Sequence, residues 1–174
     1  MKYSELCKLR EMDLKRWGGV KHISLYLFKR EYKLVYRYRM VKYLESHKWM
    51  RPFYMFERYL YNRSCMRCGC DIPSHATIGG GFKILHGWGV VINSKAVIGN
   101  NFTVVSGALI GATHTGQPII GNNVLVGAHA LLLGKIVVGD NAEIGAGAIV
   151  THDVPCYGVV YSNSSCIKRI KQCD

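Results

Sequence analysis

The sequence predicts a mainly β fold, a parallel β-helix of about four coils preceded by an α-helical N-terminal domain. Three observations support this prediction. An aliphatic residue returns every six positions through the C-terminal three-fifths of the 174-residue chain, and seventeen of the 19 glycines lie between 69 and 158. Charge changes at the same boundary, because residues 1–70 hold 17 Lys and Arg against 6 Asp and Glu, whereas the rest hold 6 against 5. We expect a basic helical domain over 1–68, the β-helix over 69–155 and a C-terminal tail over 156–174.

The N-terminal domain is predicted to contain three helices. The paired glycines Gly18-Gly19 end a first helix over 3–17, and Ser24 is a suitable cap for a second over 24–46. A third helix begins near Pro52, a residue that suits the first helical turn, and runs to about Tyr61.

The second predicted helix interleaves aromatic and aliphatic residues with Lys and Arg, and two interpretations of it are open. A basic helix with an apolar face can lie on an anionic membrane surface. Equally, that face can pack against the other helices or a neighbouring subunit, with the charges solvated. Basic charge with aromatics also fits nucleic acid, but no recognised motif accompanies it, so we expect no nucleic-acid partner.

Seven cysteines without a framework spacing indicate reduced thiols. Cys65, Cys68 and Cys70 are expected in a turn between the two domains; three clustered thiols with no partner pair do not predict a metal site. The sequence contains neither a signal-peptide core nor an apolar run of about eighteen residues. A cytoplasmic protein is therefore favoured, and the membrane alternative would place it at the inner face of the membrane.

The aliphatic repeat has a period of six, which fits neither an amphipathic helix nor an alternating strand but is known from β-helices. Each hexad can form one short strand and one corner, with the aliphatic side chain inside. Two steps differ from six: eight residues separate Ile84 from Ile92, and ten separate Ile110 from Ile120. The full series is Ile72, Ile78, Ile84, Ile92, Ile98, Val104, Ile110, Ile120, Val126, Leu132, Val138, Ile144 and Val150.

The eight-residue step contains His86, and Asp71 precedes this histidine by fifteen residues, less than one coil. An imidazole with a pKa near 6.5 can accept the proton of a hydroxyl group that attacks a thioester. A carboxylate on its other ring nitrogen fixes the tautomer and stabilises the imidazolium that forms. The spacing predicts that the two side chains lie close together across adjacent coils, where they could act as such a pair, and a simple turn residue is the alternative interpretation of His86.

The run from Asp71 to Ile92 resembles the serine acetyltransferase branch of the hexapeptide-repeat acyltransferases, in which an Asp and a His at this spacing form the catalytic dyad. The resemblance implies a left-handed β-helix with three flat faces and eighteen residues per coil. The phrase His86-Gly-Trp-Gly-Val-Val-Ile-Asn93, together with a basic helical segment, is similar to family members that acetylate capsule and exopolysaccharide sugars.

Two departures from the serine enzymes bear on the acceptor. Those enzymes carry an acidic residue before the catalytic His, where this chain has Leu85, and an Arg-His-Pro run where it has Gly116-Gln117-Pro118. The resemblance then implies an acetyl-CoA-dependent O-acetyltransferase acting on a sugar hydroxyl of a capsule or exopolysaccharide precursor, which can be lipid-linked. Serine O-acetyltransferase is the alternative, and a non-catalytic hexapeptide scaffold or binding module is the second alternative.

The ten-residue step predicts an extruded loop over 112–118, and the resemblance implies that this loop reaches toward a neighbouring subunit. His114 in this loop is an alternative base, and His114, Trp88 and Gln117 are candidates for acceptor binding. The resemblance implies a coenzyme A groove between subunits of a homotrimer, with a hexamer if the N-terminal helices add an interface. No metal requirement is expected. A metal site of the γ-carbonic-anhydrase kind needs three converging His, and no His pair with a short spacing accompanies His86 and His114. By position, the coenzyme A contacts are Ala112, Thr113, Ala128, Ala146, Lys168 and Arg169.

Overall fold

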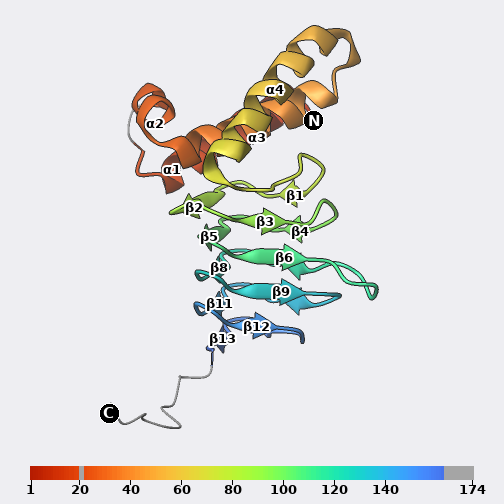
Figure 1. The fold of residues 1–174 in the computed structure, drawn as a ribbon. Coiled ribbons are helices and arrows are strands. Elements are labelled where there is room, and N and C mark those ends of the chain that lie inside the picture. Colours follow the sequence, from red (N-terminus) through yellow and green to blue (C-terminus); the bar gives the residue numbers. More distant parts are fainter. Residues whose placement is uncertain (20–21, 163–174) are drawn as a thin grey trace, which may run out of the picture.

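The computed structural model describes residues 1–19 and 22–162, and it contains a β-solenoid of about four coils with a layer of helices on one end. Figure 1 shows the helices gathered above the first coil and the later coils stacked below it. The predicted fold class is confirmed.

Three parallel sheets form the walls of the solenoid. The first face has the strand order β1-β4-β7-β10, the second β13-β11-β8-β5-β2, and the third β12-β9-β6-β3. The strands are β1 (Thr77–Ile78), β2 (Lys83–Leu85), β3 (Val91–Ile92), β4 (Val97–Ile98), β5 (Thr103–Val105), β6 (Leu109–Gly111), β7 (Ile119–Ile120), β8 (Leu125–Val126), β9 (Leu131–Leu133), β10 (Val137–Val138), β11 (Glu143–Ile144), β12 (Ile149–Val150) and β13 (Val159–Val160).

The hexad aliphatic residues fill the interior, as predicted, because all thirteen are at most 4% exposed. Equivalent members pair from coil to coil: Ile78 with Ile98, Ile98 with Ile120, and Ile120 with Val138. The steps are 20, 22 and 18 residues, so the two insertions lengthen coils without shifting this register.

Three rows of corners join the faces, and we number each corner after the face that precedes it. At the first corner, Asn101, Asn123 and Asn141 have φ of 57°, 55° and 59°, a left-handed conformation that Asn tolerates better than most residues. Their side chains form a ladder: Asn101 Nδ2 donates to Asn123 Oδ1 (2.9 Å), and Asn123 Nδ2 donates to Asn141 Oδ1 (3.0 Å). These bonds hold successive corners in line.

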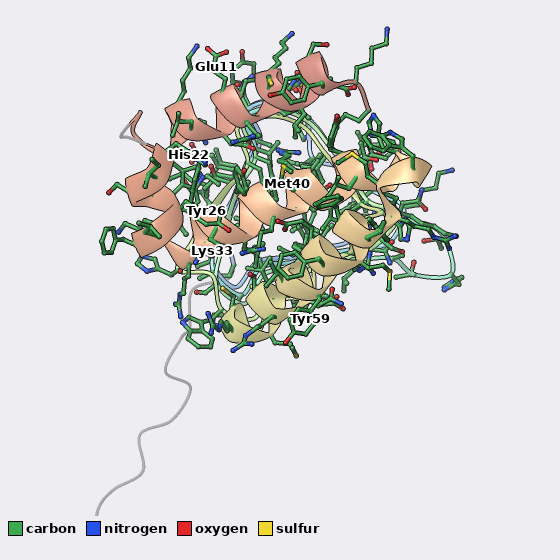
Figure 2. The ribbon with its side chains drawn as sticks, turned by 90° about the horizontal axis from the view of Figure 1, so that it is seen from above. Glu11, His22, Tyr26, Lys33, Met40 and Tyr59 are labelled. Carbon is green, nitrogen blue, oxygen red and sulfur yellow. The ribbon has the colours of Figure 1, made fainter. Side chains whose placement is uncertain are left out.

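The helical layer consists of α1 (Tyr3–Arg16), α2 (His22–Phe28), α3 (Arg30–Glu45), the 3-10 turn η1 (Lys48–Met50) and α4 (Arg51–Cys68). The continuous helix predicted over 24–46 is wrong, because Lys29 is extended at φ −108° and ψ 102°. Ten residues of one helix would span about 15 Å, yet the rings of Tyr26 and Tyr36 are 5.1 Å apart. The break therefore folds α2 back against α3. Figure 2 shows His22, Tyr26 and Lys33 together on the upper surface.

The predicted end of the third helix near Tyr61 is also wrong. α4 continues to Cys68 and ends with Gly69 in the left-handed conformation at φ 57°, a common helix stop. Cys65 and Cys68 are consequently helical. The prediction that they lie in a turn between the two domains is wrong.

A buried ion pair joins the helices to the first coil. Arg39 of α3 and Asp13 of α1 are 1% and 2% exposed, and Arg39 Nε and Nη2 donate to the two carboxylate oxygens at 2.9 and 3.1 Å. Arg39 also donates to the carbonyl oxygens of Ile78 and Gly79, both at 2.6 Å, while the Phe82 amide donates to Asp13 at 2.9 Å. Side chains of the helical layer thus form the hydrogen bonds to the first coil that the backbone of a preceding coil would form.

Further donors from the helices reach the same edge. Tyr38 and Lys42 donate to the Ala76 carbonyl at 2.5 and 2.6 Å, and Tyr61 donates to the Ile72 carbonyl. Burial raises the pKa of Tyr38, so its hydroxyl stays a donor. The apolar face of the basic helix does pack, as one interpretation expected, but it packs on the first coil, where Leu34, Val35 and Val41 join the core of the solenoid. The charges are not all solvated, because Arg39 is buried and Lys42 is bonded to the first coil. None of the helices within the described ranges is long and apolar enough to cross a membrane.

Candidate functional site

His86 begins the second corner of the first coil, directly after β2. It is exposed and has φ 52°, and the Trp88 amide donates to its carbonyl at 2.7 Å, which closes a three-residue turn. Trp88 is 54% exposed. The eight-residue step therefore presents two ring side chains at the surface within three residues.

Asp71 lies beside the third face, where its backbone pairs with Val91. Its amide donates to the Val90 carbonyl, and its carbonyl accepts from the Ile92 amide, both at 2.8 Å. The Asp71 side chain is exposed, and no hydrogen bond or ion pair links it to His86 within the described part of the chain. The two residues occupy neighbouring positions of the first coil but their side chains are not joined.

A surface groove of the third face connects Asp71 with a predicted coenzyme A contact. Asp71, Asn93, Leu109, Ala112 and Leu133 are among its lining residues, and the cavity measures about 450 Å³. His86 does not line this groove. Within one chain the groove thus contains Asp71 of the predicted catalytic pair and Ala112 of the predicted coenzyme A contacts.

The loop after β6 forms a tight hairpin at the third corner. Thr113 and Gly116 exchange two backbone hydrogen bonds of 2.9 and 3.2 Å, and Thr115 Oγ1 lies 2.7 Å from Thr113 Oγ1. His114 at its tip is exposed, and Gln117 is half-buried at its base. Figure 1 shows this loop extending away from the solenoid wall beyond β6.

Ala128 and Ala146 stack on one another at the second corner, on consecutive coils. The Gly147 amide donates to the Ala128 carbonyl at 2.8 Å, and a Cβ on Gly127 would lie 2.6 Å from the Ala146 amide nitrogen. The corners are therefore packed backbone against backbone. At the surface of this column Ala128 is half-buried, whereas Ala146 and Gly147 are exposed.

The predicted cofactor contacts fall into two groups. Ala112 and Thr113 follow the third face, whereas Ala128 and Ala146 precede it, so the length of a three-residue strand, about 10 Å, separates the groups within one chain. Lys168 and Arg169 lie outside the described residues.

Two residues that sequence reasoning missed also approach the His86 corner. A Cβ on Gly87 would lie 2.9 Å from Cγ of Glu31, so the start of α3 packs directly on the turn. The guanidinium carbon of Arg30 lies 4.4 Å from the centroid of the Trp88 ring. More than fifty residues separate these partners in sequence, and no local pattern would indicate their contact.

The thiols at the end of α4 lie near the same corner. Burial raises the pKa of Cys65 to about 11 and also raises the pKa values of Cys68 and Cys70. Raised thiol pKa values disfavour thiolates, the form that binds metals and attacks electrophiles. Nowhere in residues 1–19 and 22–162 do three or more His, Cys, Asp or Glu gather as potential metal ligands.

Comparisons with known proteins define the class. Residues 117–152 match the family described as bacterial transferase hexapeptide (six repeats). A serine acetyltransferase of Bacillus subtilis is 41% identical over 114 residues, 63% of this chain and 52% of that protein. A colanic acid biosynthesis acetyltransferase of Escherichia coli K12 is 40% identical over 106 residues, 59% of this chain and 65% of that protein. The solenoid is thus of the hexapeptide-repeat transferase class.

Solved structures extend the similarity into the helices. Neisseria gonorrhoeae serine acetyltransferase has a TM-score of 0.74 and 30% identity, covering 97% of this chain and 67% of its own. Serine acetyltransferase 1 of Entamoeba histolytica, in complex with L-cysteine, has a TM-score of 0.75 and 27% identity, covering 92% and 64%. This chain belongs to the serine acetyltransferase family. It spans between about half and two thirds of the length of these relatives.

Proposed function

We propose that this protein transfers the acetyl group of acetyl-CoA to a hydroxyl group, with His86 as the general base. The observation that carries the proposal is the placement of His86, in a chain of this family, on an exposed left-handed corner residue beside the Asp71 segment. A general base must be accessible to the acceptor proton, and an exposed ring meets that requirement.

In the proposed reaction His86 takes the proton from the acceptor hydroxyl while its oxygen attacks the thioester carbonyl. The tetrahedral intermediate then expels the coenzyme A thiolate, which receives the proton from His86. Asp71 is proposed to orient the imidazole and stabilise its protonated form. The Glu31 side chain packs on Gly87 of the same corner, and its carboxylate accepts a hydrogen bond from Arg30 Nε.

Acetyl-CoA fits the main-chain column of the second corner, where small side chains let a pantetheine chain approach the backbone amides. The loop contacts Ala112 and Thr113 lie at the other end of the third face, and the groove between subunits that the resemblance implies would take the loop from one subunit and the column from another. A homotrimer is therefore proposed. In support of it, Val97, Ile119 and Val137 form an apolar stripe, each 44–48% exposed, on the outside of the first face.

Two classes of acceptor are proposed, an amino acid and a sugar. Three of the four relatives named above are serine acetyltransferases, so the comparisons favour serine over the sugar hydroxyl predicted from the sequence. A sugar remains the second candidate, for two reasons. Leu85 replaces the acidic residue that precedes the catalytic His in the serine enzymes, and the E. coli relative is named for polysaccharide biosynthesis.

Release of free thiol from acetyl-CoA tests the chemistry. We expect His86→Ala to lower the rate by about 10²- to 10⁴-fold, the usual contribution of a general base, while His114→Ala stays within a few-fold of wild type. Asp71→Asn should also lower the rate, because it removes the carboxylate proposed to orient the imidazole. Full activity of His86→Ala, or a large loss in His114→Ala alone, would refute the assignment.

Paired assays with L-serine and with simple glycosides test the acceptor. Mass spectrometry of the product shows whether an amino acid or a sugar gains the acetyl group. Light scattering on the purified protein tests the trimer, and a monomer that retains full activity would exclude a shared groove.

A further inference from the structure

Trp88 is exposed but firmly held. Half of its surface is open to solvent, although a large aromatic ring is costly to leave exposed. The first residue after α4 lies beside it, since a Cβ on Gly69 would be 3.6 Å from Trp88 Cε3, and the Trp88 carbonyl accepts from the Gly107 amide at 2.7 Å. The ring is therefore presented on a rigid backbone.

Arg30 lies over the same ring with its guanidinium 4.4 Å from the centroid. Its Nε donates to Glu31 Oε1 at 2.9 Å, which fixes the orientation of the planar group. Within the described residues no hydrogen bond uses its Nη1 or Nη2, and its side chain is 46% exposed. Two parallel N–H donors of this kind match a carboxylate in bidentate geometry.

The pair lies two residues from the proposed base. Arg30 covers part of the indole, and the rest of the ring stays open to solvent. That open apolar surface suits a pyranose, whose C–H groups can lie against an aromatic ring, whereas serine has no apolar surface of that size.

We propose that Trp88 and Arg30 form the acceptor platform, and that the acceptor is a pyranose bearing a carboxylate, a uronic acid residue. In this arrangement the sugar ring contacts Trp88, its carboxylate binds Arg30, and one ring hydroxyl faces His86. This inference rests on the proposed acetyltransferase function and takes its second acceptor candidate, a sugar, over serine, because the exposed indole offers a surface that a serine side chain cannot cover. It makes α3 a determinant of specificity, although the reacting groups belong to the solenoid.

Calorimetric binding of small glycosides tests the platform without requiring turnover. Methyl glucuronoside and methyl glucoside differ only in the C6 carboxylate, and L-serine is the third ligand. We expect the full-length protein to bind the uronoside at least about tenfold more tightly than the glucoside. Arg30→Met should remove that difference, whereas Trp88→Ala should weaken both glycosides and Trp88→Phe should restore part of the loss.

Arg10→Met is the matched control, because Arg10 also lies 4.4 Å from an aromatic centroid, that of Tyr36, away from His86. It should leave all binding unchanged, and circular dichroism melts of each variant check folding. Equal affinity for the two glycosides, no uronoside binding, or uronoside binding that survives Arg30→Met would each overturn the proposal. So would serine binding that depends on Arg30 while the uronoside does not bind.

The binding assay also separates this inference from the general function. Loss of acetyl transfer in His86→Ala with uronoside binding intact supports both. A wild-type protein that acetylates serine but not the uronoside overturns the platform and leaves the acetyltransferase proposal standing.

Discussion

The solenoid interior and the junction beneath the helices stabilise the same fold by opposite means. Inside the solenoid, each coil repeats the last, the side chains are aliphatic, and the backbone groups pair with the next coil at the same register. At the junction no coil precedes the first, and charged and phenolic groups of α3 and α4 donate to its free carbonyls, while Asp13 of α1 accepts from its Phe82 amide. A coil that follows another coil pairs its backbone with that coil. The first coil has no such neighbour, so a separate set of side chains from the helices must pair with its backbone.

The largest effect is expected from breaking the ion pair at the junction. Arg39→Met leaves the buried Asp13 carboxylate without its partner, and losing one member of a buried pair typically costs about 3–5 kcal/mol. Urea unfolding followed by circular dichroism measures the change. Lys15→Met is the control, because Lys15 and Glu11 form a pair of similar length, 2.8 Å, with both side chains more than 60% exposed. Equal effects of the two substitutions would mean that the junction does not stabilise the fold.

A smaller effect is expected from the asparagine ladder of the first corner. Asn123→Ala loses two side-chain hydrogen bonds and forces a Cβ-bearing residue without a polar group to keep φ near 55°. We expect a loss of about 1–2 kcal/mol in the free energy of unfolding. Asn123→Gly keeps the conformation and loses only the ladder, so it should cost less. If glycine costs as much as alanine, the ladder and not the backbone conformation explains the asparagine.

The smallest effect is expected on the pH dependence of folding stability at acid pH. Asp140 accepts hydrogen bonds from the Asn122 amide (2.6 Å) and side chain, and these bonds lower the pKa of its carboxyl. A lowered folded-state pKa stabilises the fold above the ordinary carboxyl value near pH 4, and the contribution is lost as pH falls through the folded pKa. Asp140→Asn should therefore flatten the pH dependence of stability below about pH 4. Glu143→Gln, at a carboxylate without a hydrogen bond in the described structure, should leave the profile unchanged.

Much of the solenoid could be predicted from the sequence because its determinants are local. Each hexad contains its own aliphatic residue, so the buried positions and the two interrupted steps follow from counting. The helical layer was predicted less well, since Lys29 breaks a helix whose local pattern is continuous. That break depends on Tyr26 packing against Tyr36, a tertiary contact that propensity does not report.

The candidate site shows the same division. His86 and Asp71 were identified by spacing and resemblance, and the structure places both near the start of the third face. Arg30 and Glu31 could not be found in this way, because their importance arises only when α3 crosses the corner. The pairing of Asp71 with His86 remains a prediction, as their side chains make no hydrogen bond or ion pair in the described chain.

The unequal coil lengths of 20, 22 and 18 residues have an evolutionary consequence. Extra residues enter at corners, where they leave the strand register and the interior volume unchanged. The corner loops can therefore change independently of the three sheets. New acceptors could then be acquired by altering a turn and the helix above it while the stacked framework persists. Exchanging residues 86–90 together with 29–31 between relatives should transfer preference more completely than exchanging either segment alone.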